Sequence, residues 1–437
     1  MNRKNESNDL FCDGFRTDPY WWDDVARPEP GATVPPAEAD VVIIGSGYTG
    51  LSAALQTLRG GRSTVVLDAE TAGWGCSTRN GGQISTSVKL DFEELSARHG
   101  ADRAVRILKE GHDALAWIGR FIADEKIDCD FEVCGRFHAA HNPAQFSRLA
   151  ARIEREPEGL ETGAYLVERS DQRTELGTDT YFGGLVFPRH AALHPARYHH
   201  GLLTRVLGTG GKVISRCPAT DISRDGAAFL VKTPRGLIRA GDVVVATNGY
   251  TSGSTPWLRR RVIPIGSYMI ATESLDTDLM ARLMPKNRIV GDTRKLVYYY
   301  RPSPDRRRIL FGGRVSLNET DPRRTAQRLH SDLVNIFPEL TRTRISHSWS
   351  GFVAYTFDTL AHIGRHEGVH HAMGYCGSGV SMASYLGMRL GQKVLGLAEG
   401  QTAFDNLTFQ TRPLYSGNPW FLSPTIAYYR WRDRRNW

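Results

Sequence analysis

The sequence predicts an α/β fold of the Rossmann type, and three features between residues 40 and 68 predict it. An apolar run, Val41 to Ile44, has the composition of a buried strand and leads into a glycine-rich turn, Gly45-Ser46-Gly47-Tyr48-Thr49-Gly50. Apolar residues then recur at helical spacing, at Leu51, Ala54, Leu55 and Leu58. A second short strand, Thr64 to Leu67, ends in an acid, Asp68. Strand, glycine turn, helix, strand and acid in this order are typical of a dinucleotide-binding βαβ unit.

Each part of this unit has a physical task. Gly45 permits the tight turn, and Gly47 lets backbone amides approach a pyrophosphate that a Cβ would keep away. Gly50 lets the helix sit close to the strand. The helix begins near Tyr48 and Thr49, where its free N–H groups and partial positive charge favour phosphate. A carboxylate about 20 residues beyond the glycines, as at Asp68, can take the ribose hydroxyls.

Length and composition bound the class of protein. The chain has 437 residues, 41% of them hydrophobic and 23% charged, which indicates a soluble globular protein with a large core and two domains rather than one. No apolar run approaches the length of a membrane helix, and the N-terminus lacks the apolar region of a secretory signal. Six cysteines lie scattered without CxxC or metal-type spacing. We therefore expect reduced thiols in the cytoplasm and no metal site.

The net charge of +8 comes mainly from arginine. A basic chain can bind nucleic acid or an anionic surface. Here the basic residues are spread along the chain, with local clusters only at 259–261, at 306–308 and in the last residues. We interpret them as a solvated surface and expect no nucleic-acid partner.

Three further segments indicate that the dinucleotide is FAD. A glycine-bearing loop from Gly73 to Gln83 can lay backbone against a flat ring and offer Arg79 to phosphate. The strand pattern Val369 to Met373 leads into Gly374-Tyr375-Cys376-Gly377-Ser378-Gly379 and a helix, whose dipole would stabilise the negative charge of a reduced flavin. A buried-type strand also ends in Thr247-Asn248-Gly249. No second complete GxGxxG follows a strand, so we expect electrons to enter from a substrate rather than from a nicotinamide cofactor.

With these segments in order, the chain resembles the D-amino-acid oxidase-type FAD oxidoreductases, with most likeness to the gamma-glutamylputrescine oxidase branch. The motifs that carry the likeness span most of the chain: Tyr20-Trp21-Trp22, Gly45 to Gly50, Arg79-Asn80-Gly81-Gly82-Gln83, Leu193-His194-Pro195, Ala246 to Tyr250, Trp349-Ser350-Gly351, Asp358 with His362-Ile363-Gly364, Gly374 to Gly379, and Asn418 to Leu422. The first glycine motif is generic. The RNGGQ loop and the NPWFL tail are much more specific.

Several positions depart from the family pattern. Asp68 stands where Glu is usual, and Ala361 replaces a common Pro. Ser378 stands where a His is frequent. Family members that bind FAD covalently carry a cysteine just before a Tyr-Thr pair, whereas Val353-Ala354 precede Tyr355 here. The resemblance therefore implies noncovalent FAD.

The resemblance implies discontinuous domains. FAD-binding segments would be 38–90, 186–262 and 346–400, and an antiparallel-sheet substrate domain would come from 91–185 and 263–345, giving an α/β plus α+β protein. Residues 1–37 would form an N-terminal arm and 401–437 a C-terminal tail. The alternating stretch 295–301 and the strand 308–312 suit such a sheet.

The resemblance also implies the chemistry. A neutral amine would give hydride to flavin N5, water would hydrolyse the resulting imine, and dioxygen would reoxidise the flavin to yield hydrogen peroxide. Aromatic candidates for the substrate pocket are Tyr298, Tyr299 and Tyr300, of which we assign Tyr300 to the site. On a strand Tyr298 and Tyr300 share one face, and Tyr299 shares the other with Arg301, a candidate clamp for a substrate carboxylate. His194 is a candidate polar residue near the flavin. Sheet packing and structural roles are the alternatives for all of these candidates.

The residues that we expect to bind FAD are Gly45, Gly47, Tyr48, Thr49, Gly50, Asp68, Arg79, Asn80, Gly81, Gly82, Gln83, Thr247, Asn248, Gly249, Gly377, Ser378, Gly379 and Val380. The leading hypothesis is oxidation of gamma-glutamylputrescine or a related amine. An oxidase or dehydrogenase of a secondary amino acid, a tRNA-modifying flavoprotein and a noncatalytic flavin-binding module stay open as alternatives. The sequence leaves the oligomeric state open.

Overall fold

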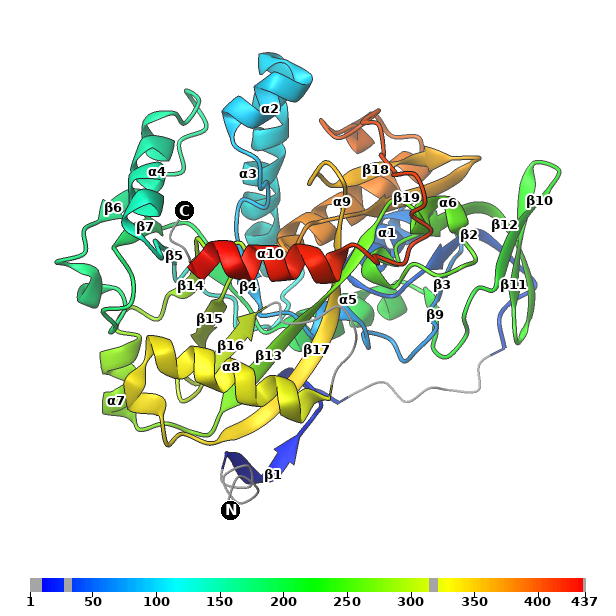
Figure 1. Ribbon diagram of the computed structural model, residues 1–437. Coiled ribbons are helices and arrows are strands. Elements are labelled where there is room, and N and C mark those ends of the chain that lie inside the picture. The colour runs from blue at the N-terminus through cyan, green and yellow to red at the C-terminus, as the bar shows by residue number, and fades with distance from the viewer. Residues whose placement is uncertain (1–9, 27–33, 314–320, 435–437) are drawn as a thin grey trace.

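Two large sheets organise the chain (Figure 1). A computed structural model describes residues 10–26, 34–313 and 321–434. One sheet is built around parallel strands and carries the glycine turn, and the other has nine mostly antiparallel strands. This arrangement confirms the predicted combination of a Rossmann-like unit with an antiparallel-sheet unit. The N-terminal residues 1–9 and 27–33 and the C-terminal residues 435–437, which we assigned to the arm and the tail, lie outside the described residues.

The first sheet has a parallel centre. β2 (Glu38–Ile44) pairs in parallel with β3 (Thr64–Leu67) on one side and with β12 (Gly236–Val245) on the other. β9 (Lys212–Ile214) extends the sheet beyond β3, and β19 (Val369–Met373) pairs in parallel with β12. Antiparallel partners complete it: β10 (Asp221–Asp225), β11 (Ala228–Thr233) and β18 (His362–His366). The predicted buried strands 41–44 and 242–245 thus lie side by side at its centre.

Helices α1 (Tyr48–Arg59) and α9 (Gly379–Val394) follow the two glycine turns and pack closely together. A Cβ at Gly387 of α9 would lie 2.4 Å from the carbonyl oxygen of Thr49, so glycine is needed for this approach. α3 (Ala101–Asp124) and α5 (Pro195–Gly208) share the same hydrophobic core through Ile118 and Leu202. This core fixes the N-termini of α1 and α9 relative to one another.

The second sheet runs in the order β1-β17-β13-β16-β15-β14-β5-β7-β6. Its strands are β1 (Phe11–Arg16), β17 (Ile345–Tyr355), β13 (Ile263–Thr272), β16 (Ile309–Gly313), β15 (Tyr299–Pro302), β14 (Ile289–Asp292), β5 (Arg136–Ala139), β7 (Gly184–Phe187) and β6 (Tyr165–Val167). Two pairs, β1 with β17 and β14 with β5, are parallel, and the others are antiparallel. Helix α8 (Pro322–Ile336) lies along one face (Figure 1), where Leu329 and Leu333 join the core that contains Tyr300 and Phe311.

Strand pairing refines the expected division of the chain. β17 pairs along its length with β13, so residues 346–355 belong with the second sheet although we assigned them to the FAD-binding segments. β1 comes from the expected N-terminal arm and also joins this sheet.

The remaining elements are α2 (Phe92–His99), α4 (Pro143–Glu154), α6 (Pro256–Arg259), α7 (Thr277–Leu283), α10 (Leu422–Arg434) and the small pair β4 (Gln83–Ile84) with β8 (Ala191–Ala192). No helix among the described residues combines the length and apolar character needed to span a membrane.

Candidate active site

The first glycine turn has the geometry that its sequence predicts. Gly45 has a φ of +103°, a conformation that other residues rarely adopt. A Cβ at Gly50 would lie 1.9 Å from the carbonyl oxygen of Gly45, so only glycine lets α1 pack this close to β2. Gly47 is the N-cap of α1. The first turn of α1 therefore directs backbone N–H groups and the positive end of its dipole toward the space beyond β2.

Three segments that are far apart in the sequence meet at this turn. The hydroxyl groups of Thr49 in α1 and Tyr375 in the second glycine turn lie 2.7 Å apart. The Asn248 side chain accepts a hydrogen bond from the Gly374 backbone N–H at 2.9 Å. Ser378 is the N-cap of α9. Two helix N-termini and the end of β12 therefore border one space, as we expect for a flavin dinucleotide site.

Two buried tryptophans hold the RNGGQ loop in place. Trp21 donates a hydrogen bond from its indole N–H to the carbonyl oxygen of Asn80 at 2.8 Å, and Trp349 donates to that of Arg79 at 2.9 Å. The Asn80 side chain accepts from the Gly82 backbone N–H at 2.8 Å. The YWW, WSG and RNGGQ motifs are thus one structural unit, which holds the loop rigidly beside the glycine turn.

One cavity of about 480 Å³ connects these segments, a volume within the range of small-molecule and cofactor sites. Most residues that we expected to bind FAD line it: Gly45, Gly47, Tyr48, Thr49, Asp68, Arg79, Asn80, Gly81, Gln83, Thr247, Asn248, Gly377, Ser378, Gly379 and Val380. Gly50, Gly82 and Gly249 lie behind this lining. Gly50 and Gly82 permit close backbone packing there, because a Cβ at Gly82 would lie 2.2 Å from the carbonyl oxygen of Leu193.

The groups that line the cavity are of the kinds that bind FAD. Glycine backbone and two helix N-termini suit the pyrophosphate, Asp68 suits the ribose, and the Gly81 and Gly377 segments suit a flat ring. Cys76 also lines the cavity, but desolvation raises the pKa of its thiol to about 11, so the thiol stays protonated and is a poor nucleophile. Val353 and Ala354 occupy the wall before Tyr355. These features support noncovalent binding.

The structure places Arg301 away from the cavity. Its side chain is buried, and Nη1 donates to the carbonyl oxygen of Leu193 at 2.9 Å and to that of Gly82 at 3.4 Å. Nη1, one of the groups that we expected to clamp a substrate carboxylate, therefore holds the RNGGQ loop against the start of α5. Arg301 is a positioning residue in this geometry, and the expected clamp is not where we predicted it.

Tyr300 and His194 also lie outside the cavity lining, and both belong to the described part of the chain. Tyr300 is fully buried and packs on Phe311 and Phe337 beneath α8, so the strand directs it to the opposite face. His194 is the N-cap of α5, where Nδ1 accepts from the Arg197 backbone N–H at 3.2 Å. Both have structural positions rather than the catalytic ones that we expected.

The neighbouring tyrosine, Tyr299, takes the place expected for Tyr300. It lines the cavity beside Gly81, and its hydroxyl lies 2.8 Å from that of Ser267 on β13. The alternation of side chains along β15 already placed Tyr299 and Arg301 on one face. What the sequence could not show is that this face, rather than the face of Tyr300, meets the FAD-binding segments.

Sequence reasoning also missed Arg136 on β5 and Lys89, which both line the cavity. Arg136 stands in a short strand, RFHA, whose motif gives no catalytic signal. Lys89 follows β4 in an irregular segment. Only the tertiary structure brings these two cations to the same cavity as Tyr299.

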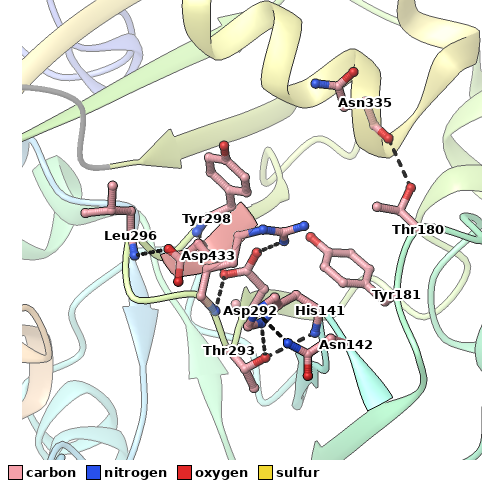
Figure 2. Close-up of polar contacts among 12 residues, drawn as sticks. His141, Asn142, Thr180, Tyr181, Asp292, Thr293, Leu296, Tyr298, Asn335 and Asp433 are labelled. Atoms are coloured by element: carbon pink, nitrogen blue, oxygen red, sulfur yellow. Dashed lines mark hydrogen bonds and ion pairs between the residues drawn. The ribbon is translucent and has the colours of Figure 1, made fainter. Parts of the chain in front are cut away.

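A polar network holds the turn that carries Val297 into the cavity (Figure 2). The carboxylate of Asp292 pairs with the Arg294 guanidinium and accepts from the Tyr298 backbone N–H at 3.1 Å. Asp433 of α10 accepts from the backbone N–H groups of Lys295 and Leu296, each at 3.1 Å. The C-terminal helix is therefore anchored on the cavity wall.

Comparisons with known proteins agree with this geometry. A family model described as FAD dependent oxidoreductase matches residues 40–393. The chain belongs to this family. Gamma-glutamylputrescine oxidoreductase of Escherichia coli (strain K12) is 32% identical over 400 residues, which is 90% of this chain and 93% of that protein.

Solved structures show the same fold. Glycine oxidase from Geobacillus kaustophilus superposes with a TM-score of 0.71 at 16% identity, covering 86% of this chain and 99% of that one. L-proline dehydrogenase from P. horikoshii gives a TM-score of 0.70 at 17% identity, covering 90% and 99%. The protein is an FAD-dependent oxidoreductase, and the recognised family and the expected cofactor are confirmed.

Proposed function

We propose that this FAD-dependent oxidoreductase oxidises the C–N bond of an amine, with gamma-glutamylputrescine or a related amine as substrate and dioxygen as electron acceptor. One cavity carries this proposal, because its wall combines the FAD-binding segments with Tyr299 of the second sheet. The relative from Escherichia coli, named for gamma-glutamylputrescine, supports the choice of amine.

FAD bound in the cavity would supply the acceptor for a hydride from the carbon that carries the amine. The protein's own part is to bind the amine, orient it and keep it deprotonated. Aromatic side chains line the space, among them Trp74, Tyr250 and Tyr299. A cavity of this kind disfavours the ammonium form and lowers the pKa of the bound amine, so its nitrogen lone pair is available.

The products follow from the electron balance. Loss of a hydride from carbon and a proton from nitrogen converts the amine to an imine. Water then hydrolyses the imine to an aldehyde and ammonia, while dioxygen takes two electrons and two protons to give hydrogen peroxide. With such a substrate, the enzyme would act in polyamine catabolism. All six cysteines are free thiols, which supports our proposal of a cytoplasmic location.

Product analysis tests this function. The purified holoenzyme is incubated in air with gamma-glutamylputrescine, putrescine, sarcosine and proline, and aldehyde, ammonia and peroxide are measured. We expect equal amounts of aldehyde, ammonia and peroxide from gamma-glutamylputrescine. Turnover of sarcosine or proline alone would move the assignment to secondary amino acids. Turnover that needs an artificial acceptor would identify a dehydrogenase instead of an oxidase.

A further inference from the structure

We propose that Arg136 and Lys89 form a subsite for a carboxylate group carried by the amine substrate. This inference rests on the proposed amine oxidation and names the substrate class more closely: an amine whose other end bears a carboxylate. It also replaces the clamp that we expected at Arg301, which lies outside the cavity lining and whose Nε and Nη1 groups already donate to carbonyl oxygens.

The strand register places Arg136 next to Tyr299. β5 pairs with β14, and β14 pairs with β15 so that Gly291 is directly opposite Tyr299. A Cβ at Gly291 would lie 2.4 Å from Nη2 of Arg136, so the guanidinium extends across β14 at this glycine. Arg136 therefore reaches along the cavity face of the sheet toward Tyr299.

A second glycine, Gly312, makes room for the ring of Tyr299 on the same face of the sheet. A Cβ at Gly312 of β16 would lie 2.3 Å from the ring of Tyr299. The ring thus lies flat over β16, with its hydroxyl near Ser267 and its edge near Gly81. Two glycines on adjacent strands allow a cation and an aromatic ring to lie side by side on the cavity floor.

Arg136 makes no ion pair with any described residue, and its buried Nε has no hydrogen-bond partner. The nearby carboxylate of Asp292 is already used by Arg294 and by the turn amides shown in Figure 2. A desolvated guanidinium without a carboxylate is costly to bury, and a planar, bidentate anion offsets that cost. A substrate carboxylate is such an anion.

The surroundings add positive charge. Desolvation, and then the charge of Arg152 on α4, lower the pKa of Arg136 to about 10, so it stays protonated at neutral pH. Lys89 lies close enough to both His138 and Cys376 for its charge to act on each. Lys89 is therefore on the side of the cavity where the second sheet meets the second glycine turn. The two cations together favour an anionic group over a neutral one.

Specificity ratios test the subsite. The ratio of kcat/KM for gamma-glutamylputrescine over that for putrescine is measured in the wild-type holoenzyme, Arg136→Gln, Arg136→Lys and Arg148→Gln. We expect Arg136→Gln to reduce the ratio roughly 10- to 150-fold, as for loss of a charge-assisted bidentate contact. Arg136→Lys should recover only part of it, because an ammonium lacks the planar fork. Arg148→Gln removes an exposed charge on the same helix, α4, outside the cavity lining, and is the matched control.

Binding of an unreactive probe gives a readout independent of turnover. N-butylglutaramate carries a carboxylate and no amine, and N-butylglutaramide is its neutral counterpart. Shifts in the visible spectrum of the bound FAD report their dissociation constants. We expect the wild-type protein to prefer the carboxylate probe, and Arg136→Gln to lose that preference while Arg148→Gln keeps it.

The outcomes separate the two proposals. If no amine is oxidised but the carboxylate probe is still preferred through Arg136, the proposed reaction fails and the subsite stands. If amines are oxidised and both the ratio and the probe preference survive Arg136→Gln, the subsite is refuted while the reaction stands. Should Arg136→Gln lose FAD, Lys89→Gln is measured in its place, with a loss of carboxylate preference expected and an unchanged preference refuting the subsite.

Discussion

Asp68 accepts two hydrogen bonds from Ser46, one from its backbone N–H at 2.9 Å and one from its hydroxyl at 2.5 Å. The serine lies between the first two glycines of the turn, so the turn itself orients the acid that ends β3. The other carboxylate oxygen accepts from the Glu70 backbone N–H at 2.9 Å. The acid is thus rigid and faces the cavity.

Removal of this carboxylate should weaken FAD binding. A hydrogen bond to a charged group is worth about 1.5–3 kcal/mol, so Asp68→Ala should raise the Kd of FAD by roughly 10- to 150-fold. Asp68→Glu keeps the charge and should retain most of the affinity. Titration of the apoprotein with FAD, followed by fluorescence, measures both. Unchanged affinity in Asp68→Ala would remove Asp68 from the ribose site.

The flavin should be released intact by acid. Val353 and Ala354 line the wall where covalent relatives would place a cysteine, and the Cys76 thiol is held protonated by its raised pKa. Precipitation with trichloroacetic acid should leave yellow FAD in the supernatant, identified by its mass. Flavin that stays with the precipitated protein would show a covalent bond.

Arg301→Ala should destabilise the protein without changing the choice of amine. The substitution leaves the buried carbonyl oxygen of Leu193 without its donor, which costs about 1–3 kcal/mol. We expect a lower Tm of the holoenzyme, and a ratio of kcat/KM between gamma-glutamylputrescine and putrescine close to that of the wild type. A selective loss of gamma-glutamylputrescine oxidation would return the carboxylate clamp to Arg301.

His194 should make the protein sensitive to acid. Desolvation lowers the pKa of His194 from 6.5 to about 3, so the folded protein keeps it neutral. Above pH 6.5 the residue is neutral in both states, and as the pH falls from 6.5 toward 3 only the unfolded chain binds the proton. Stability is therefore lost as the pH falls through this range, by at most roughly 1.4 kcal/mol per pH unit.

His194→Asn tests this pH dependence, because asparagine keeps an N-cap acceptor for α5 and does not titrate. The difference in unfolding free energy between variant and wild type, measured in urea from pH 7 to pH 4.5, should shift in favour of the variant as the pH falls. A constant difference would show that His194 does not protonate on unfolding in this range.

Most of the cavity lining around the two glycine turns could be predicted from the sequence, because local rules govern these turns. Steric requirements that act between residues close in the sequence explain Gly45 and Gly50. The helix that follows is predicted by the helical spacing of its apolar residues. The substrate side depends on how distant strands pair. Which face of β15 meets the cofactor is decided by the register with β14 and β16, so the choice between Tyr299 and Tyr300 could not be made from the alternation alone.

Arg136 illustrates the same limit. Its neighbours in the sequence, Gly135 and Phe137, carry no functional signal. Its place in the cavity lining depends on Gly291, which is far along the chain and directly opposite Tyr299 in the sheet. Arg301 shows the reverse case: a strand arginine beside tyrosines suggested a ligand contact, but its side chain holds the RNGGQ loop and the start of α5 together.

Anaerobic reduction of the bound flavin tests the central claim most directly. The holoenzyme is mixed without oxygen with gamma-glutamylputrescine, NADH or NADPH, and the loss of the flavin absorption band is followed. We expect gamma-glutamylputrescine to bleach the flavin rapidly and both nicotinamides to leave it oxidised. Rapid bleaching by NADH or NADPH, with none by any amine, would contradict the assignment of this protein as an amine oxidoreductase.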